Sequence, residues 1–244
     1  MDWTDGAIVL GSRGQGENNT ITKLFTRSYG AKSAVVHGGR GTRKGAVLQP
    51  GNRVQVSWRG KSPDDLGRFE VELEAPHASG ALSSRLGILA LGSVTELLER
   101  SLPDANSYPE LFTATDALLG HLHDDEILSV LMVHWEIGVL SSLGFGLTLD
   151  KCAATGQMLE DGADLVFVSP KSGGAVSMEA GLPYKEKMLP LPPFIIGRGE
   201  PTYEDVAAAL SMTGHFLQNW LLAPDGGFLP EPRERLVRKL KGRI

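Results

Sequence analysis

Three cations among four glycines form the densest chemical motif of this sequence, Gly38-Gly39-Arg40-Gly41-Thr42-Arg43-Lys44-Gly45. Glycines let a backbone approach a phosphate chain closely, and Arg and Lys side chains neutralise phosphate charges and release their counterions. We therefore expect a loop here that follows a polyanion.

A second glycine-rich run, Gly11-Ser12-Arg13-Gly14-Gln15-Gly16-Glu17, follows an apolar segment. Phosphate cradles of this kind open onto a helix, whereas the next residues are polar and β-branched, and no Gly-Lys-Ser/Thr ending is present. The run is more typical of a barrel loop, from which Arg13 would contact nucleic acid.

The distribution of charge supports a polyanionic partner, although the 244-residue chain has 24 basic and 29 acidic residues and a net charge of −5. Residues 13–61 contain ten bases and one acid, whereas residues 77–230 contain seven bases and nineteen acids. Like charges held this close are costly unless a partner or solvent balances them. A solvated basic face without a partner is the alternative.

Two other clusters invite enzymatic readings. One contains His121, His123 and Asp125 and suggests a metal-dependent hydrolase. Neighbouring residues on a helix point about 100° apart, however, and a helix end followed by an acidic N-cap explains these residues without a metal, which we therefore favour. Cys152 is the single cysteine, which excludes an intramolecular disulfide and a zinc site of several thiolates. We predict no catalytic residue, no metal, no cofactor and no enzymatic activity.

The first 76 residues predict short strands between glycine turns, because apolar and polar residues alternate with a period of two. The expected strands cover residues 7–10, 20–26, 31–36, 53–59 and 68–74, with turns at 11–19, Ser28-Tyr29-Gly30 and Pro50-Gly51-Asn52. Five strands in so short a segment favour a closed barrel, which has no exposed edges. An oligonucleotide-binding (OB) barrel is the natural candidate.

Alternation also assigns faces to two of these strands. One face of the strand that begins at Thr20 carries Ile21, Lys23, Phe25 and Arg27. Phe25, between two cations, is a candidate for base stacking, although Ile21 and Phe25 are equally consistent with a core. Arg53, Gln55, Ser57 and Arg59 share another, which we expect to be exposed and basic, with Trp58 in the core.

From residue 77 the apolar spacing changes to three and four, which predicts helices over 86–98, 108–123, 125–143, 203–222 and 233–240. Residues 165–193 predict an irregular excursion with a strand or two. The expected fold is α+β and multidomain: an OB-fold DNA-binding barrel over residues 1–76, and a mainly α-helical domain over residues 77–244. The acidic N-terminus and the lack of a long apolar run predict a cytoplasmic protein that does not enter membranes.

Several segments in succession resemble the bacterial recombination mediator family RecO. The matching pieces of the first half are residues 6–10, Gly16-Glu17, Phe25-Thr26, Gly30, Gly38-Gly39-Arg40 and Leu48-Gln49-Pro50-Gly51. Those of the second half are Trp135-Glu136, Leu140, Leu143-Gly144-Phe145, Leu149-Asp150-Lys151-Cys152, Gly156, Phe167-Val168-Ser169-Pro170 and Gly173-Gly174. Their order and spacing are kept across most of the chain.

The resemblance implies a non-enzymatic mediator that binds single- and double-stranded DNA, anneals strands and, with RecR, loads RecA onto DNA coated by single-stranded-DNA-binding protein. It also implies that the C-terminal tail of that protein docks on the helical domain, and that the mediator associates with the nucleoid during repair. Thr155 replaces the second cysteine of a Cys-x-x-Cys pair found in many members, so no metal is expected. His134 replaces an Arg that serves the tail in some relatives, and Arg233 is a possible substitute.

The predicted DNA contacts are the cations of the first 59 residues: Arg13, Lys23, Arg27, Lys32, Arg40, Arg43, Lys44, Arg53 and Arg59. An adaptor whose basic barrel binds RNA or an acidic protein remains the alternative.

Overall fold

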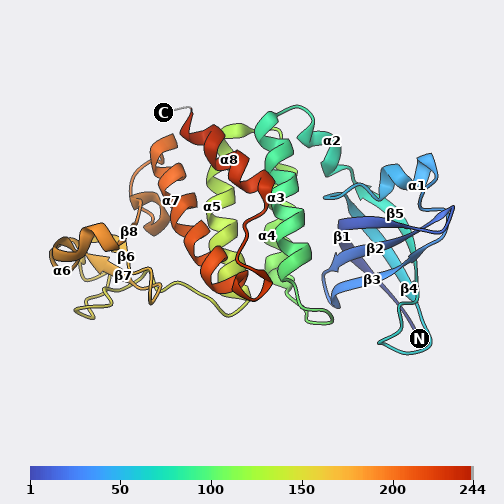
Figure 1. The fold of residues 1–244 in the computed structure, drawn as a ribbon, viewed down its shortest axis with the longest axis horizontal. Helices are drawn as coiled ribbons and strands as arrows, with labels where there is room; N and C mark the ends of the chain where they lie inside the picture. Colours follow the sequence, from blue (N-terminus) through green and yellow to red (C-terminus); the bar gives the residue numbers. More distant parts are fainter. Residues whose placement is uncertain (243–244) are drawn as a thin grey trace. The chain divides into compact units, whose positions relative to one another are not determined.

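The N-terminal strands close into a barrel. The computed structural model describes residues 1–242. Strands β1 (Asp2–Gln15), β2 (Asn19–Thr26), β3 (Gly30–Val36), β4 (Arg53–Arg59) and β5 (Arg68–Ala75) are hydrogen-bonded in the order β1-β2-β3-β5-β4 (Figure 1). All neighbours are antiparallel except β3 and β5, which pair in parallel at two positions. The predicted five-stranded barrel followed by helices is confirmed.

Alternate residues of these strands fill the barrel, as the period of two requires. Val54, Val56 and Trp58 of β4 are at most 1% exposed, which confirms that Trp58 is a core residue. The side chains packed with them come from all the other strands and from the segment before β4: Ala7, Val9, Leu24, Ala34, Val36, Leu48 and Phe69.

Two segments of the barrel differ from the prediction. The expected turn over residues 11–19 is wrong in its first half, because β1 continues to Gln15, which pairs with Asn19, and the chain reverses at Gly16. The basic Gly38–Gly45 motif is not entirely a loop, because its second half begins helix α1 (Thr42–Val47). Arg43 and Lys44 therefore lie on one short helix.

The helices lie close to their predicted positions. They are α2 (His77–Ala81), α3 (Arg85–Ser101), α4 (Pro109–Gly120), α5 (Asp125–Ser142), α7 (Tyr203–Phe216) and α8 (Glu231–Lys241). Ser84 caps α3 by accepting hydrogen bonds from the backbone N–H groups of Leu86 and Gly87, and Thr202 forms a capping box with Asp205 at the start of α7. The expected helix over 203–222 changes after Phe216 to a π-turn, η3 (Leu217–Leu221).

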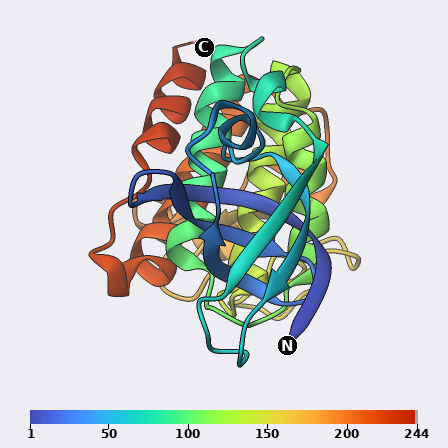
Figure 2. The same cartoon turned by 90° about the vertical axis from the view of Figure 1, so that its right-hand side faces the viewer.

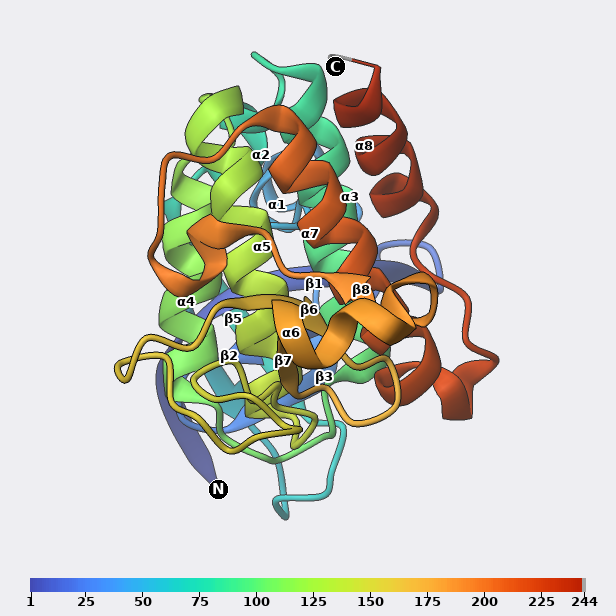
Figure 3. The same ribbon diagram turned by 90° about the vertical axis from the view of Figure 1, so that its left-hand side faces the viewer.

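The segment between α5 and α7 contains a small sheet instead of a strand or two. Strands β6 (Leu165–Val168), β7 (Ala175–Ser177) and β8 (Leu189–Pro190) pair in the order β7-β6-β8 (Figure 3). Short helical turns accompany them: α6 (Met178–Gly181), η1 (Leu182–Lys187) and η2 (Pro193–Ile196). A further turn, η4 (Ala223–Asp225), follows η3 beyond α7.

The chain divides into two compact units. The first contains Met1–Leu128 and Pro230–Arg233, and the second contains Ser129–Leu229 and the chain from Glu234 onward. Helices α2, α3 and α4 thus belong to the same unit as the barrel, and the domain division at residue 76 stays a prediction. Within the described chain, every helix is too short or too polar to cross a membrane.

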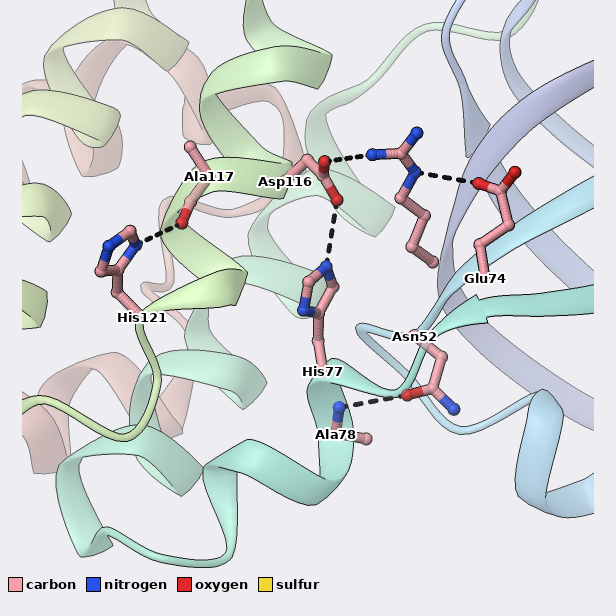
Figure 4. Close-up of polar contacts among 8 residues, drawn as sticks. Asn52, Glu74, His77, Ala78, Asp116, Ala117 and His121 are labelled. Carbon is pink, nitrogen blue, oxygen red and sulfur yellow. Dashed lines mark hydrogen bonds and ion pairs between the residues drawn. The ribbon is translucent and has the colours of Figure 1, made fainter.

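A charged cluster ties the barrel to α2 and α4 (Figure 4). Arg53 of β4 donates hydrogen bonds to Glu74 of β5 at 3.0 Å and to Asp116 of α4 at 2.5 Å, and the other oxygen of Asp116 lies 3.0 Å from His77 Nε2. Burial alone would lower the pKa of Arg53, but the attraction of Asp116 and Glu74 and the hydrogen bonds to them raise it above its ordinary value. Arg53 therefore carries a fixed charge inside an ion-pair network.

We predict that Asp116→Ala destabilises the protein, because it leaves the partly buried Arg53 guanidinium with one carboxylate partner. The free energy of unfolding should fall by about 1–3 kcal/mol in urea denaturation. Glu74→Gln is the matched control and should cost less than about 1 kcal/mol, since the Glu74 side chain is 36% exposed and that of Asp116 is 21% exposed. An unchanged midpoint for Asp116→Ala would contradict the assignment.

Candidate nucleic-acid interface

The nine predicted cations all lie on the barrel or its connections, but they do not form one surface. Arg53 is the only one of the nine in an ion pair within residues 1–242. Three are partly buried (Lys23, Lys32 and Arg53), and six are exposed (Arg13, Arg27, Arg40, Arg43, Lys44 and Arg59). The exposed six leave a large positive charge for a partner to neutralise.

The partly buried cations bind other parts of the protein. Lys23 Nζ donates a hydrogen bond to the Glu99 carbonyl of α3 at 2.7 Å, and Lys32 Nζ donates one to the Pro63 carbonyl at 2.5 Å. Together with the Arg53 network, these contacts make Lys23, Lys32 and Arg53 part of the framework. We leave the three out of the interface proposed below.

Three exposed cations lie on the segment before α1 and on α1 itself, next to the turn of the β1–β2 hairpin, and we call them the hairpin cluster. Arg40 donates a hydrogen bond to the Gly16 carbonyl at the hairpin turn at 3.0 Å, and its guanidinium lies beside Gly14. Lys44 Nζ donates to the His37 carbonyl at 2.8 Å. The side chain of Arg43 has no hydrogen bond or ion pair in the described chain, and the cluster consists of Arg40, Arg43 and Lys44.

A second basic site is a hollow of 540 Å³ at the β4–β5 loop, which we call the basic hollow. Its walls include four side chains that can carry positive charge, His37, Arg59, Lys61 and Arg68. Arg59 and Arg68 are paired neighbours on β4 and β5, and Arg68 also pairs with Val35 of β3, where the barrel closes. Figure 2 views the barrel from the side on which α1 and this loop are visible.

His37 connects the two basic sites, because its carbonyl accepts the hydrogen bond from Lys44 and it also lines the basic hollow. Of the hollow's three Arg and Lys side chains, Arg59, Lys61 and Arg68, the sequence prediction included only Arg59. A signal for the others was present, since Arg59-Gly60-Lys61 and Gly67-Arg68 flank one loop. Pairing of β3 with β5, which brings His37 to this loop, cannot be read from local alternation.

The outer face of β4 is less basic than predicted. Gln55 pairs with Glu72 and Ser57 pairs with Glu70, so the exposed acids of β5 lie directly beside this face. Because carboxylates repel phosphates, the middle of β4 is unsuited to DNA, and the positive charge is concentrated at the hairpin cluster and the basic hollow.

Of the two alternatives for Phe25, base stacking is wrong and the core position is confirmed. Its ring is fully buried and lies edge-on to Phe112 of α4, with ring centroids 5.5 Å apart. Arg27 lies over the other partner of this pair, 5.2 Å from the centre of the Phe112 ring. The face of β2 that carries Ile21, Lys23 and Phe25 is covered by α3 and α4, which period-two alternation cannot distinguish from an exposed face.

A groove of 660 Å³ runs beside α3 and carries mixed charge. Arg13 and Lys23 line it together with Glu96 and Glu99, and Pro232 closes one side. The two carboxylates make the groove less suited to a phosphate chain than the hairpin cluster.

The metal-hydrolase hypothesis gains no support from the geometry. His121 Nδ1 lies 2.8 Å from the Ala117 carbonyl, the His121 and His123 rings stack at 6.5 Å, and Asp125 accepts a hydrogen bond from Ser84. Across residues 1–242, no three His, Cys, Asp or Glu side chains are arranged to hold a metal ion.

Cys152 is 1% exposed and lies beside Ser177, whose backbone N–H donates to its sulfur at 3.3 Å. Burial raises the pKa of this thiol, but hydrogen bonds from Thr155 and Ser177 outweigh it and lower the pKa to about 6. Its sulfur is therefore held in a polar site and shielded from solvent.

Neither residue suggested for a protein-tail contact offers an accessible charge. Partial burial lowers the pKa of His134, whose ring lies edge-on to Phe194 at 5.8 Å, so the imidazole is neutral at pH 7. Arg233 is 3% exposed, so its guanidinium presents almost no surface to a tail.

Comparison with known proteins covers both halves of the chain. The family model for the N terminal of recombination protein O matches residues 1–76, and that for its C terminal matches residues 83–225. DNA repair protein RecO of Rhodospirillum centenum is 42% identical over 241 residues, which cover 99% of this chain and 95% of the relative. The RecO protein of Methylobacterium nodulans is 42% identical over 243 residues, which cover 97% of each chain. That of Rhodospirillum rubrum is 39% identical over 248 residues, which cover 99% of this chain and 97% of the relative. The chain therefore belongs to the RecO family of DNA repair proteins.

Proposed function

We propose that this protein is a non-enzymatic mediator of recombinational DNA repair whose barrel binds single- and double-stranded DNA through phosphate contacts. The observation that carries the proposal is the set of exposed cations without ion-pair partners on the barrel of a RecO-family chain. The hairpin cluster and the basic hollow would follow the DNA backbone without reading its sequence, because Arg and Lys contacts to phosphate carry no base information.

The same contacts would support strand annealing. Two complementary strands repel each other through their phosphates, and a protein surface that neutralises part of this charge lets them approach and pair. As part of the proposal, the protein acts with RecR to help load RecA onto DNA coated by single-stranded-DNA-binding protein, whose tail binds the helical part. These partner contacts rest on family membership, and we place the protein in the cytoplasm at the nucleoid during repair for the same reason.

We predict that changing Arg40, Arg43 and Lys44 together to Glu lowers DNA affinity by about two orders of magnitude or more. Losing three phosphate contacts should also reduce the slope of log affinity against log salt concentration by roughly 3. Fluorescence anisotropy with a labelled oligonucleotide across a salt series measures both quantities.

The matched control changes Lys171, Lys185 and Lys187 to Glu, which alters net charge equally on exposed residues of the second unit. Its DNA affinity should stay within a few-fold of wild type. Equal losses in the two triple variants would show that only overall charge matters, and an unchanged Arg40, Arg43 and Lys44 variant would exclude the hairpin cluster. Competition experiments distinguish the DNA-binding function from the adaptor alternative. If the protein is an adaptor, RNA or an acidic peptide should displace labelled DNA at a lower concentration than unlabelled DNA does.

We also predict that the wild-type protein accelerates annealing of complementary strands, including strands coated with single-stranded-DNA-binding protein, and that the Arg40, Arg43 and Lys44 variant does not. Annealing is followed by energy transfer between labels on the two strands. Tight DNA binding without any acceleration of annealing would contradict the mediator role while leaving DNA binding intact.

A further inference from the structure

Three aromatic rings form a ladder at one end of the barrel. Tyr29, in the β2–β3 turn, stacks on Trp3 of β1 with centroids 4.3 Å apart and an angle of 14° between the rings. Trp3 in turn lies 5.8 Å from Trp58 of β4 at an angle of 19°. Successive rings are thus nearly parallel, as bases are in a stacked single strand.

The ladder runs from solvent into the core. Trp58 is 1% exposed, whereas Tyr29 is 43% exposed. The ammonium group of Lys32 lies over the Trp58 ring, 4.9 Å from its centre. The Lys32 ammonium therefore closes the ladder at its buried end. Trp3 is the only ring that stacks on Tyr29 among the described residues, so Tyr29 is the last ring at the exposed end.

The turn that carries Tyr29 is held rigidly. The Tyr29 N–H donates a hydrogen bond to the Thr26 hydroxyl at 3.0 Å, and the Asp5 carboxylate accepts one from the Ser28 N–H at 2.7 Å. Gly30 has a φ of +69°, and a Cβ there would come within 2.1 Å of the Asn106 carbonyl oxygen, so the turn fits closely against the 103–107 loop. A ring fixed in this way loses little conformational freedom when it binds a ligand.

Cations lie next to the ladder. Arg27 precedes Tyr29 by two residues in the same turn and is exposed, whereas Arg59 pairs with Asp2 and points to the opposite face of the sheet from Trp3 and Trp58. The loop behind Trp58 also forms a wall of the basic hollow: Gly67 has a φ of +61°, and a Cβ there would lie 2.4 Å from Trp58 Nε1. Arg27 therefore lies in the turn that carries the outer ring, and the basic hollow begins at the loop behind the inner ring.

We propose that Tyr29 is the base-stacking residue of this barrel and that a base of single-stranded DNA continues the Tyr29–Trp3–Trp58 ladder. Stacking on an exposed aromatic ring beside a basic groove is how proteins hold single strands without reading their sequence. Bases in a duplex are already stacked, so this contact favours single strands over double strands. The inference rests on the proposed DNA-binding function and adds the element that distinguishes the two forms of DNA.

The test compares Tyr29→Ala with wild type on two single strands of about 16 nucleotides, one of thymidines and one with the same backbone but abasic throughout. Tyr29→Ala should weaken binding to the thymidine strand roughly 5- to 150-fold, the range expected for one base–aromatic stack. It should leave binding to the abasic strand and to duplex DNA unchanged, because those ligands use phosphate contacts.

Two further variants separate stacking from packing. Tyr29→Phe keeps the ring and should bind like wild type, whereas Tyr29→Leu still covers Trp3 but should bind like Tyr29→Ala. The control variant Tyr184→Ala removes another exposed tyrosine, 59% exposed in η1, and should change nothing.

An unchanged affinity of Tyr29→Ala for the thymidine strand, or an equal loss on the abasic strand, would overturn the stacking assignment while leaving the proposed function in place. Failure of the wild-type protein to bind any of the three DNAs would overturn the proposed function and the stacking assignment with it.

Discussion

Uncompensated positive charge on the barrel is the constraint on which the functional account depends. Cations held together without carboxylate partners repel one another, and a folded protein tolerates this only through solvent, salt or an anionic ligand. The chain has enough acids to neutralise them, yet Glu74 pairs with Arg53, Asp116 pairs with Arg53 and His77, and Glu70 and Glu72 lie along β5 beside the middle of β4. The exposed cations are left at the hairpin cluster and the basic hollow.

The two kinds of contact proposed for DNA have different physical origins. Phosphate contacts are long-ranged and weakened by salt, and they apply equally to single and double strands. Stacking on Tyr29 is short-ranged, depends little on salt and requires an unpaired base. A mediator that anneals strands must hold single strands and then release a duplex, and losing the stacking contact on pairing would favour that release.

The barrel could be predicted from the sequence because alternation in strands such as Arg53–Arg59 is local, and the helices because their apolar spacing is regular. The six-residue helix α1 is too short to show a period, so its residues were expected in a loop. Stacking and core positions both stayed open for Phe25 because alternation gives the face of a residue but not what covers that face. Tyr29 lies in a predicted turn, outside any periodic pattern, and its stacking on Trp3 depends on the first residues of β1, which lie before the expected first strand over 7–10.

Lysine acetylation with and without bound single-stranded DNA, read by mass spectrometry, tests the location of the interface most directly. The account predicts that DNA protects Lys44 in α1 and Lys61 in the β4–β5 loop, both exposed in the free protein, and leaves Lys171 and Lys187 as reactive as before. Protection of Lys171 and Lys187 with no change at Lys44 and Lys61 would contradict it.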